Sequence, residues 1–132
     1  MTGRKNLSTL IRNLKPTLHK GQFVFIECAF DSEIPLNDII ALFREEKGIT
    51  LIMDRGKADK TGQKYEFVAA WITLMVHSSL EAVGLTARVS QALAKEGISC
   101  NAVAAYHHDH IFVPYLDAQR ALAILTKISQ EV

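Results

Sequence analysis

Residues 107–110 read His-His-Asp-His, a compact group of side chains that could do metal or acid-base chemistry. His108 and His110 would alternate onto one face of a strand, and His77 ends another predicted strand. A catalytic zinc site needs a third protein ligand, and no spacing in this sequence fixes one. We therefore predict no metal site here, only polar histidines around a turn.

Motifs of enzymatic catalysis are absent from the sequence. There is no GxSxG, HExxH, Walker-type phosphate loop or GxGxxG motif, and no candidate nucleophilic triad. A lone His-Asp-His does not by itself define acid-base chemistry. We therefore predict a non-enzymatic protein with no catalytic residue and no cofactor.

Composition and net charge limit the kinds of partner that we expect. The chain has 132 residues, of which 48% are hydrophobic, and 15 basic against 14 acidic residues give a net charge of +1. The hydrophobic content is sufficient for a buried core. The small net charge produces no broad electrostatic field that would attract nucleic acid or anionic lipid. Cys28 and Cys100 lie in apolar runs, and no apolar stretch reaches the roughly 18 residues of a membrane span. We expect a cytoplasmic protein with no nucleic-acid or membrane partner.

The first half alternates short helical and strand patterns. Leu7, Leu10, Ile11 and Leu14 recur at helical spacing, and the apolar run 22–30 favours a strand. The pattern then predicts a helix over 36–48, a strand over 49–54 and an exposed connection over 55–64. We place the domain boundary at this connection, which gives an N-terminal unit 1–64 and a C-terminal unit 65–132.

The second half is more regular. We predict a strand over 67–77 covered on both faces, a helix over 84–97, strands over 98–106 and 110–116, and a helix from Asp117. This order is an α+β, ferredoxin-like plan, in which helices cover one face of an antiparallel sheet.

A complete ferredoxin-like unit needs a fourth strand. Few residues follow the last predicted helix, so we expect the first half to supply that strand, from 22–30 or from 49–54. The two halves would then share a strand.

Three segments of the second half carry a family resemblance. SSLEAVGLTARVSQALAKEGIS, AYHHDHIFVP and the helix start DAQRAL together resemble ACT domains, the small ligand-binding modules of amino-acid metabolism. The sequence is most similar to the paired ACT domains of arginine-sensing CASTOR proteins and aspartate kinase regulatory regions, and closer still to short bacterial tandem ACT proteins. The strong match covers residues 67–130, and EEKGITLIMD in the first half fits less distinctively.

The start of the predicted second-half helix is the candidate binding site. A helix beginning at Leu85 or Thr86 after the turn at Gly84 would aim free backbone N–H groups at a ligand carboxylate. Alternatively, Gly84 only makes a turn, and Ser78 with Glu81 forms a capping box.

Asp109 is the second part of the candidate site. The resemblance assigns Asp109 to the amino group or basic side chain of the ligand, although Asp109 with His108 could simply form a hairpin turn.

The resemblance implies two ACT-like units and a non-enzymatic amino-acid sensor, homo-oligomeric, that binds its ligand between those units. The alternative is a dimerisation or protein-interaction module without ligand, which would use the apolar strand around Trp71. The ligand-binding residues expected on this basis are Ser78, Val83, Gly84, Leu85, Thr86 and Asp109.

Overall fold

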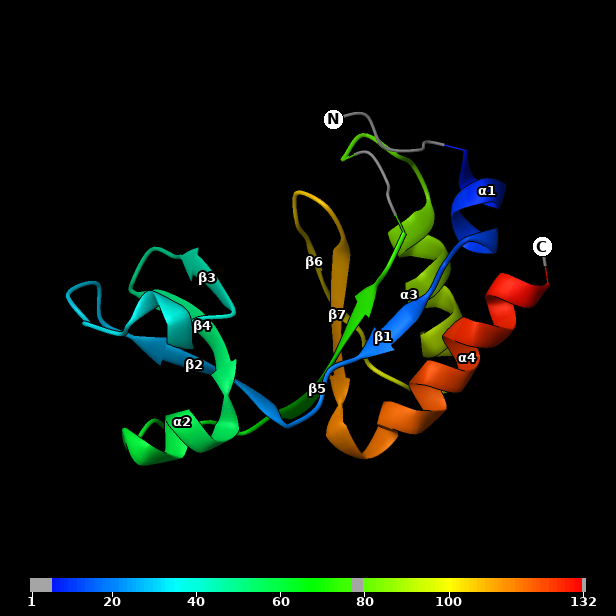
Figure 1. Cartoon of the computed structure of the whole chain (residues 1–132). Helices are drawn as coiled ribbons and strands as arrows, with labels where there is room; N and C mark the ends of the chain where they lie inside the picture. The colour runs from blue at the N-terminus through cyan, green and yellow to red at the C-terminus, as the bar shows by residue number, and fades with distance from the viewer. Residues whose placement is uncertain (1–5, 77–79, 132) are drawn as a thin grey trace. The chain divides into compact units, whose positions relative to one another are not determined.

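The computed structural model describes residues 6–76 and 80–131 of the chain (Figure 1). The chain divides into two compact units: a larger unit of Met1–His19 with Ala70–Val132, and a smaller unit of Lys20–Ala69. Within the described ranges, every helix is too short or too polar to cross a membrane.

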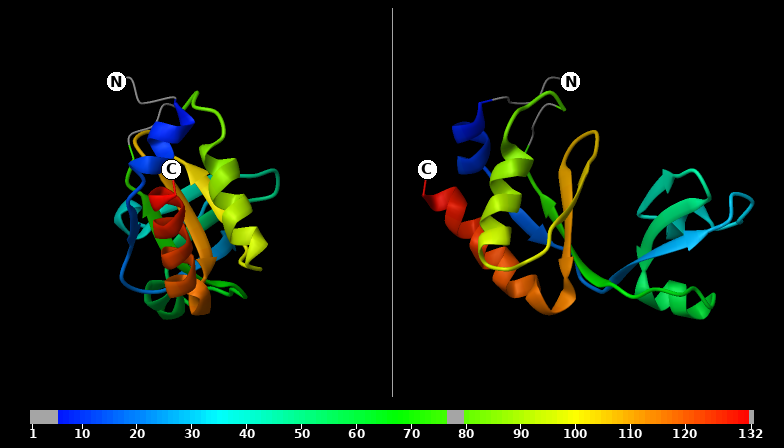
Figure 2. Two further views of the ribbon diagram at one scale, coloured as in Figure 1. Left: turned by 90° about the vertical axis from the view of Figure 1, so that its right-hand side faces the viewer. Right: turned by 180° about the vertical axis from the view of Figure 1, so that it is seen from behind.

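The larger unit is an antiparallel sheet with helices on one face (Figures 1 and 2). Its strands lie in the order β1-β5-β7-β6, and α1, α3 and α4 pack against one another. The predicted α+β, ferredoxin-like fold is confirmed. The bounds are α1 Leu7–Arg12, β1 Pro16–Leu18, β5 Val68–Leu74, α3 Leu85–Lys95, β6 Asn101–Ala104, β7 Asp109–Pro114 and α4 Ala118–Gln130.

The fourth strand of this sheet is β1. Pro16–Leu18 pairs antiparallel with the second part of β5, from Leu74 to Ile72, whereas Phe23 and Val24 pair with only its first two residues. Our expectation therefore placed the completing strand too late in the chain. A three-residue strand that begins with proline has no alternation to reveal it, and Pro16 had indicated only the end of a helix.

The buried side chains of the larger unit explain why the helices pack on one face of the sheet. Ala70, Ile72 and Leu74 alternate along β5 toward the helices and are buried, while Trp71 and Thr73 lie on the opposite face. The helices contribute their apolar stripes to the same core, with Leu10, Val89, Leu93 and Leu125 essentially inaccessible to solvent.

The strands of the smaller unit lie in the order β3-β4-β2, and the start of β5 pairs with β2, so these strands are part of the same seven-stranded sheet. Its bounds are β2 Phe23–Cys28, β3 Ala41–Arg44, β4 Ile49–Asp54 and α2 Arg55–Lys60. A separate cluster of buried side chains, Val24, Ile26, Leu51, Met53 and Ala58, forms its core.

The helix predicted over 36–48 is wrong. The segment forms a short 3-10 turn at Leu36–Asp38 and then strand β3, which pairs antiparallel with β4 through a tight turn closed by Glu45 N–H to the Gly48 carbonyl at 2.8 Å. Gly48 therefore lies in a turn between two strands and ends no helix. A Cβ at this position would lie 2.8 Å from the carbonyl oxygen of Cys28. Close backbone approach, rather than helix termination, requires this glycine.

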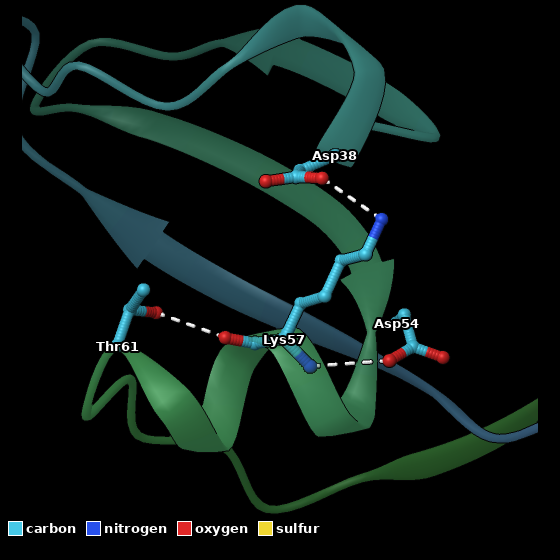
Figure 3. Close-up of polar contacts among 4 residues, drawn as sticks. All are labelled: Asp38, Asp54, Lys57 and Thr61. Atoms are coloured by element: carbon cyan, nitrogen blue, oxygen red, sulfur yellow. Dashed lines mark hydrogen bonds and ion pairs between the residues drawn. The ribbon is translucent and has the colours of Figure 1, made fainter.

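The exposed connection predicted over 55–64 is also wrong in part, because it contains α2. The side chain of Asp54 caps this helix by accepting from the Lys57 N–H at 3.1 Å, and Lys57 Nζ lies 2.8 Å from Asp38 (Figure 3). The hydroxyl of Thr61 donates to the Lys57 carbonyl at the other end (Figure 3). With only Ala58 buried, the helix has too little apolar pattern to be predicted from sequence.

Candidate functional site

Helix α3 begins with an N-terminus that no side chain caps. Its N-cap residue is Gly84, at φ +99° and ψ −12°, and among the residues that the structure describes no side-chain hydrogen bond caps this end. The first N–H groups of a helix have no acceptor within the helix, so those of Leu85, Thr86 and Ala87 carry the positive end of the helix dipole. The segment from 84 onward therefore offers hydrogen-bond donors to an anion.

The backbone conformation and the packing at position 84 both require a glycine. Its positive φ is a conformation that residues with a Cβ rarely adopt, and a Cβ at this position would lie 3.2 Å from Cδ2 of Leu7 in α1. The glycine thus sets both the turn into α3 and the close packing of α1 beside it.

A pocket of about 130 Å³ opens at this helix terminus. The side chain of Asp109, at the start of β7, lines the pocket together with the first turn of α3. The lining residues are Leu80, Ala82, Gly84, Leu85, Thr86, Ala87, Ala104 and Asp109.

Four of the residues expected to bind ligand come together in this pocket, and two do not. Gly84, Leu85, Thr86 and Asp109 line it, whereas Val83 is 81% exposed and is not part of the lining. Ser78 lies outside the described residues.

Sequence reasoning missed the pocket's apolar wall. Ala104 ends β6 and is paired in register with Asp109 across the β6–β7 hairpin, which brings both residues to the pocket. The predicted hairpin carried this signal, because the residue opposite Asp109 must share its face of the sheet.

The carboxyl group of Asp109 is half-buried, which disfavours its ionised form. Burial raises its pKa, while nearby His110, a hydrogen bond from the hydroxyl of Thr86 and nearby His108 act in the opposite direction. Removal of this carboxylate from water is therefore compensated only in part. A cation placed in the pocket would complete the compensation.

The pocket thus presents charges of both signs. Backbone N–H groups at the start of α3 suit a carboxylate, and Asp109 suits an ammonium group. The remaining wall is made of leucine and alanine side chains. Such a pocket is complementary to a small zwitterion with an uncharged side chain.

The histidines of the described residues have other surroundings than a metal-binding group. Across residues 6–76 and 80–131, no group of three or more His, Cys, Asp or Glu side chains is arranged to hold a metal ion. His107 and His108 flank the β6–β7 turn, which Ala105 N–H closes on the His108 carbonyl at 3.1 Å. His110 points instead toward Trp71, whose indole N–H it accepts at 3.0 Å.

Comparison with protein families gives two matches in tandem. A model described as ACT domain matches residues 2–70, and a second model with the same description matches residues 66–127. A comparison with curated proteins finds no significant match.

Several solved structures are similar. A Vibrio cholerae protein of unknown function, described as a possible transport protein, is 41% identical, with a TM-score of 0.80 over 95% of this chain and 97% of its own. The regulatory subunit of Thermus thermophilus aspartate kinase, in its ligand-free form, is 10% identical, with a TM-score of 0.58 over 86% of this chain and 95% of its own.

Escherichia coli aspartokinase III, solved with aspartate and ADP, is 14% identical, with a TM-score of 0.60 over 88% of this chain and 34% of its own. At these low identities, the two aspartate kinases show similarity of fold alone.

Proposed function

Because the chain belongs to the ACT domain family, we propose that it is a non-enzymatic regulatory protein that binds a free amino acid in the pocket at the start of α3. The resemblance seen in the sequence is confirmed at the level of the family and of the fold. ACT domains are typically regulatory ligand-binding modules, and one of the similar structures is the regulatory subunit of an aspartate kinase.

One observation carries the proposal: the half-buried carboxylate of Asp109 lines the same pocket as the uncapped N-terminus of α3. The α-carboxylate of an amino acid would accept from the N–H groups of Leu85 and Thr86. Its α-ammonium would lie beside Asp109 and would compensate the carboxylate that burial leaves short of partners.

The pocket also favours some amino acids over others. Its apolar wall, with Leu80, Ala82 and Ala104, has no charged group other than Asp109 among the described lining residues. A charged ligand side chain would lose its hydration there without gaining a partner. We therefore expect amino acids with small, uncharged side chains to bind more tightly than charged ones.

The test is a thermal-shift screen of the purified protein against the twenty amino acids at millimolar concentration. A ligand at about one hundred times its Kd stabilises the folded state by about 2.7 kcal/mol, which raises Tm by roughly 5 to 15 °C. Asp109→Asn should abolish the shift, and Asp31→Asn, which changes an exposed aspartate of the smaller unit, should leave it intact. An unchanged shift in Asp109→Asn would contradict the proposed site.

We also propose that the protein is a homo-oligomer whose assembly responds to the amino acid. A ligand can shift such an equilibrium only by the difference in its affinity for the two states. Sedimentation velocity with and without the stabilising amino acid measures this difference. A strict monomer in both conditions would rule out an oligomeric sensor and would argue against dimerisation through the strand around Trp71.

A further inference from the structure

A second polar cluster lies on the face of the larger unit's sheet opposite the helices. It consists of His19 after β1, Trp71 and Thr73 on β5, and His110 on β7, and we call it the His–Trp cluster. The His19 ring stacks on Trp71 with their centroids 3.6 Å apart and their planes within 10° of parallel. Thr73 is 4% exposed, so its hydroxyl depends on the cluster for hydrogen bonds.

The donors and acceptors of the cluster determine where its protons are. The indole N–H of Trp71 can only donate, and it lies 3.0 Å from Nδ1 of His110, so Nδ1 must be an unprotonated acceptor. The hydroxyl of Thr73 lies 3.0 Å from the same Nδ1 and 2.6 Å from Nε2 of His19. A continuous chain follows: His19 Nε2–H donates to Thr73, and Thr73 donates to His110.

A proton on His110 is incompatible with this arrangement. Neutral His110 carries its hydrogen on Nε2, so an added proton must go to Nδ1. Nδ1–H would then face the indole N–H of Trp71, donor against donor. The bond through Thr73 can reverse its direction, because a hydroxyl both donates and accepts, but the Trp71 bond cannot. Protonation therefore acts on Trp71 in particular.

The groups that face His110 determine how readily it takes up a proton. The imidazole of His19, just after β1, opposes a positive charge on His110, and so does His108 in the turn before β7, while the neighbouring carboxylate of Asp109 favours that charge. From β5, Trp71 and Thr73 contribute no charge. Burial is the largest influence, and together these groups lower the pKa of His110 from its ordinary value of 6.5.

We propose that the His–Trp cluster is a pH-responsive switch, in which uptake of one proton by His110 at Nδ1 breaks the Trp71 bond and displaces the Trp71 ring. The ring would leave its stack with His19 and change the sheet face opposite the helices. The four residues of the switch are distinct from the described residues that line the pocket at α3, and the two sites are linked electrostatically through Asp109, which lines the pocket and neighbours His110.

The sequence makes the test simple, because Trp71 is the only tryptophan. In ¹⁵N-labelled protein, a single indole N–H resonance reports on its bond to His110. We expect this resonance to move between about pH 8 and about pH 4.5, with a midpoint below 6.5 that matches the pKa of one histidine measured from its ring carbons. If the resonance stays still, or moves with a midpoint that no histidine shares, the switch is refuted.

A matched pair of variants assigns the effect. His110→Asn keeps an acceptor near the position of Nδ1 but cannot take up a proton, so the part of the indole titration that shares the midpoint of His110 should disappear, and any movement that remains should follow His19, which stacks on Trp71. His107→Asn, at the exposed turn between β6 and β7, should leave the titration unchanged.

Thermal melting gives a reading that does not depend on the resonance. The fall in Tm from about pH 7.5 to about pH 5.5 should be smaller by a few degrees in His110→Asn than in the wild type or in His107→Asn. An equal fall in all three proteins would refute the proposal.

Discussion

The chain carries two matches to the same family description, but its two compact units differ in how they close their cores. The larger unit covers one sheet face with α1, α3 and α4, whereas the smaller unit has one six-residue helix, α2, and a short 3-10 turn within its described residues. Part of this difference comes from the N-terminal segment. The first family match begins at residue 2, yet α1 and β1 pack within the larger unit. Family boundaries along the sequence and packing boundaries in space therefore do not coincide.

The helix termini show what this difference means for function. The N-terminus of α2 is capped by the carboxylate of Asp54, which accepts from the Lys57 N–H. The N-terminus of α3 has a glycine instead, with no side-chain cap, and a pocket lies beside it. An internal carboxylate stabilises the one helix, while the other retains donors for an external one. This contrast supports the proposed ligand site in the larger unit.

The largest expected effect tests whether α1 belongs to the larger unit. Leu10 in α1 is fully buried in that core, and Leu10→Ala should lower the free energy of unfolding by about 2–5 kcal/mol. Leu116→Ala is the control, because Leu116 is 94% exposed, and it should change stability by no more than about 0.5 kcal/mol. Urea unfolding measures both. Equal stabilities would mean that α1 does not contribute to the core.

Gly84→Ala tests the uncapped helix terminus. A Cβ at φ +99° is strained and approaches Leu7, so we expect a loss of about 1–3 kcal/mol together with a smaller amino-acid-induced rise in Tm. Gly97→Ala is matched, since Gly97 has φ +74° but no atom within 4 Å of an added Cβ. It should cost less and leave the ligand response intact. If both variants reduce the ligand response equally, that response does not depend on the α3 terminus.

Asp54→Ala tests the capped terminus of α2. Removing the acceptor of the Lys57 N–H should cost about 1 kcal/mol. The amino-acid-induced rise in Tm should keep its full size, because Asp54 belongs to the smaller unit and does not line the pocket. A loss of the ligand response in this variant would contradict the contrast between the two helix termini.

Helices and strands with regular apolar spacing could be predicted from the sequence. The stripe of Leu85, Val89 and Leu93 predicted α3, and the turn at Gly84 placed its start beside Asp109. Strand β3 could not be predicted, since Leu36 and Phe43 fall at spacings that a helix also satisfies, and the decisive contact of Gly48 is with the distant backbone of Cys28.

The His–Trp cluster could not be predicted either. His19 reaches Trp71 only because β1 pairs with β5, and nothing local in the sequence reveals that pairing. Long-range strand pairing, rather than residue type, was the missing information.

The smallest expected effect separates a binding residue from a structural one. Burial raises the pKa of Asp109 above 3.8, so the folded state holds its proton more tightly than the unfolded state does. The stabilising contribution of this group is complete in acid and is lost as the pH rises through the raised pKa, so the ionised carboxylate costs stability at pH 7. Asp109→Asn removes that cost and should raise Tm at pH 7 by at most a few degrees, because solvent screens a half-exposed group.

The gain from Asp109→Asn should shrink toward zero as the pH falls below 3.8, which melting curves across the acid range would show. A variant that is more stable and yet no longer responds to any amino acid would mean that Asp109 is retained for a ligand. A variant that is less stable at pH 7 would mean that the carboxylate serves Thr86 and the start of α3 as an internal partner. In that case, both helix termini would be closed from within, and the contrast between the two units would disappear.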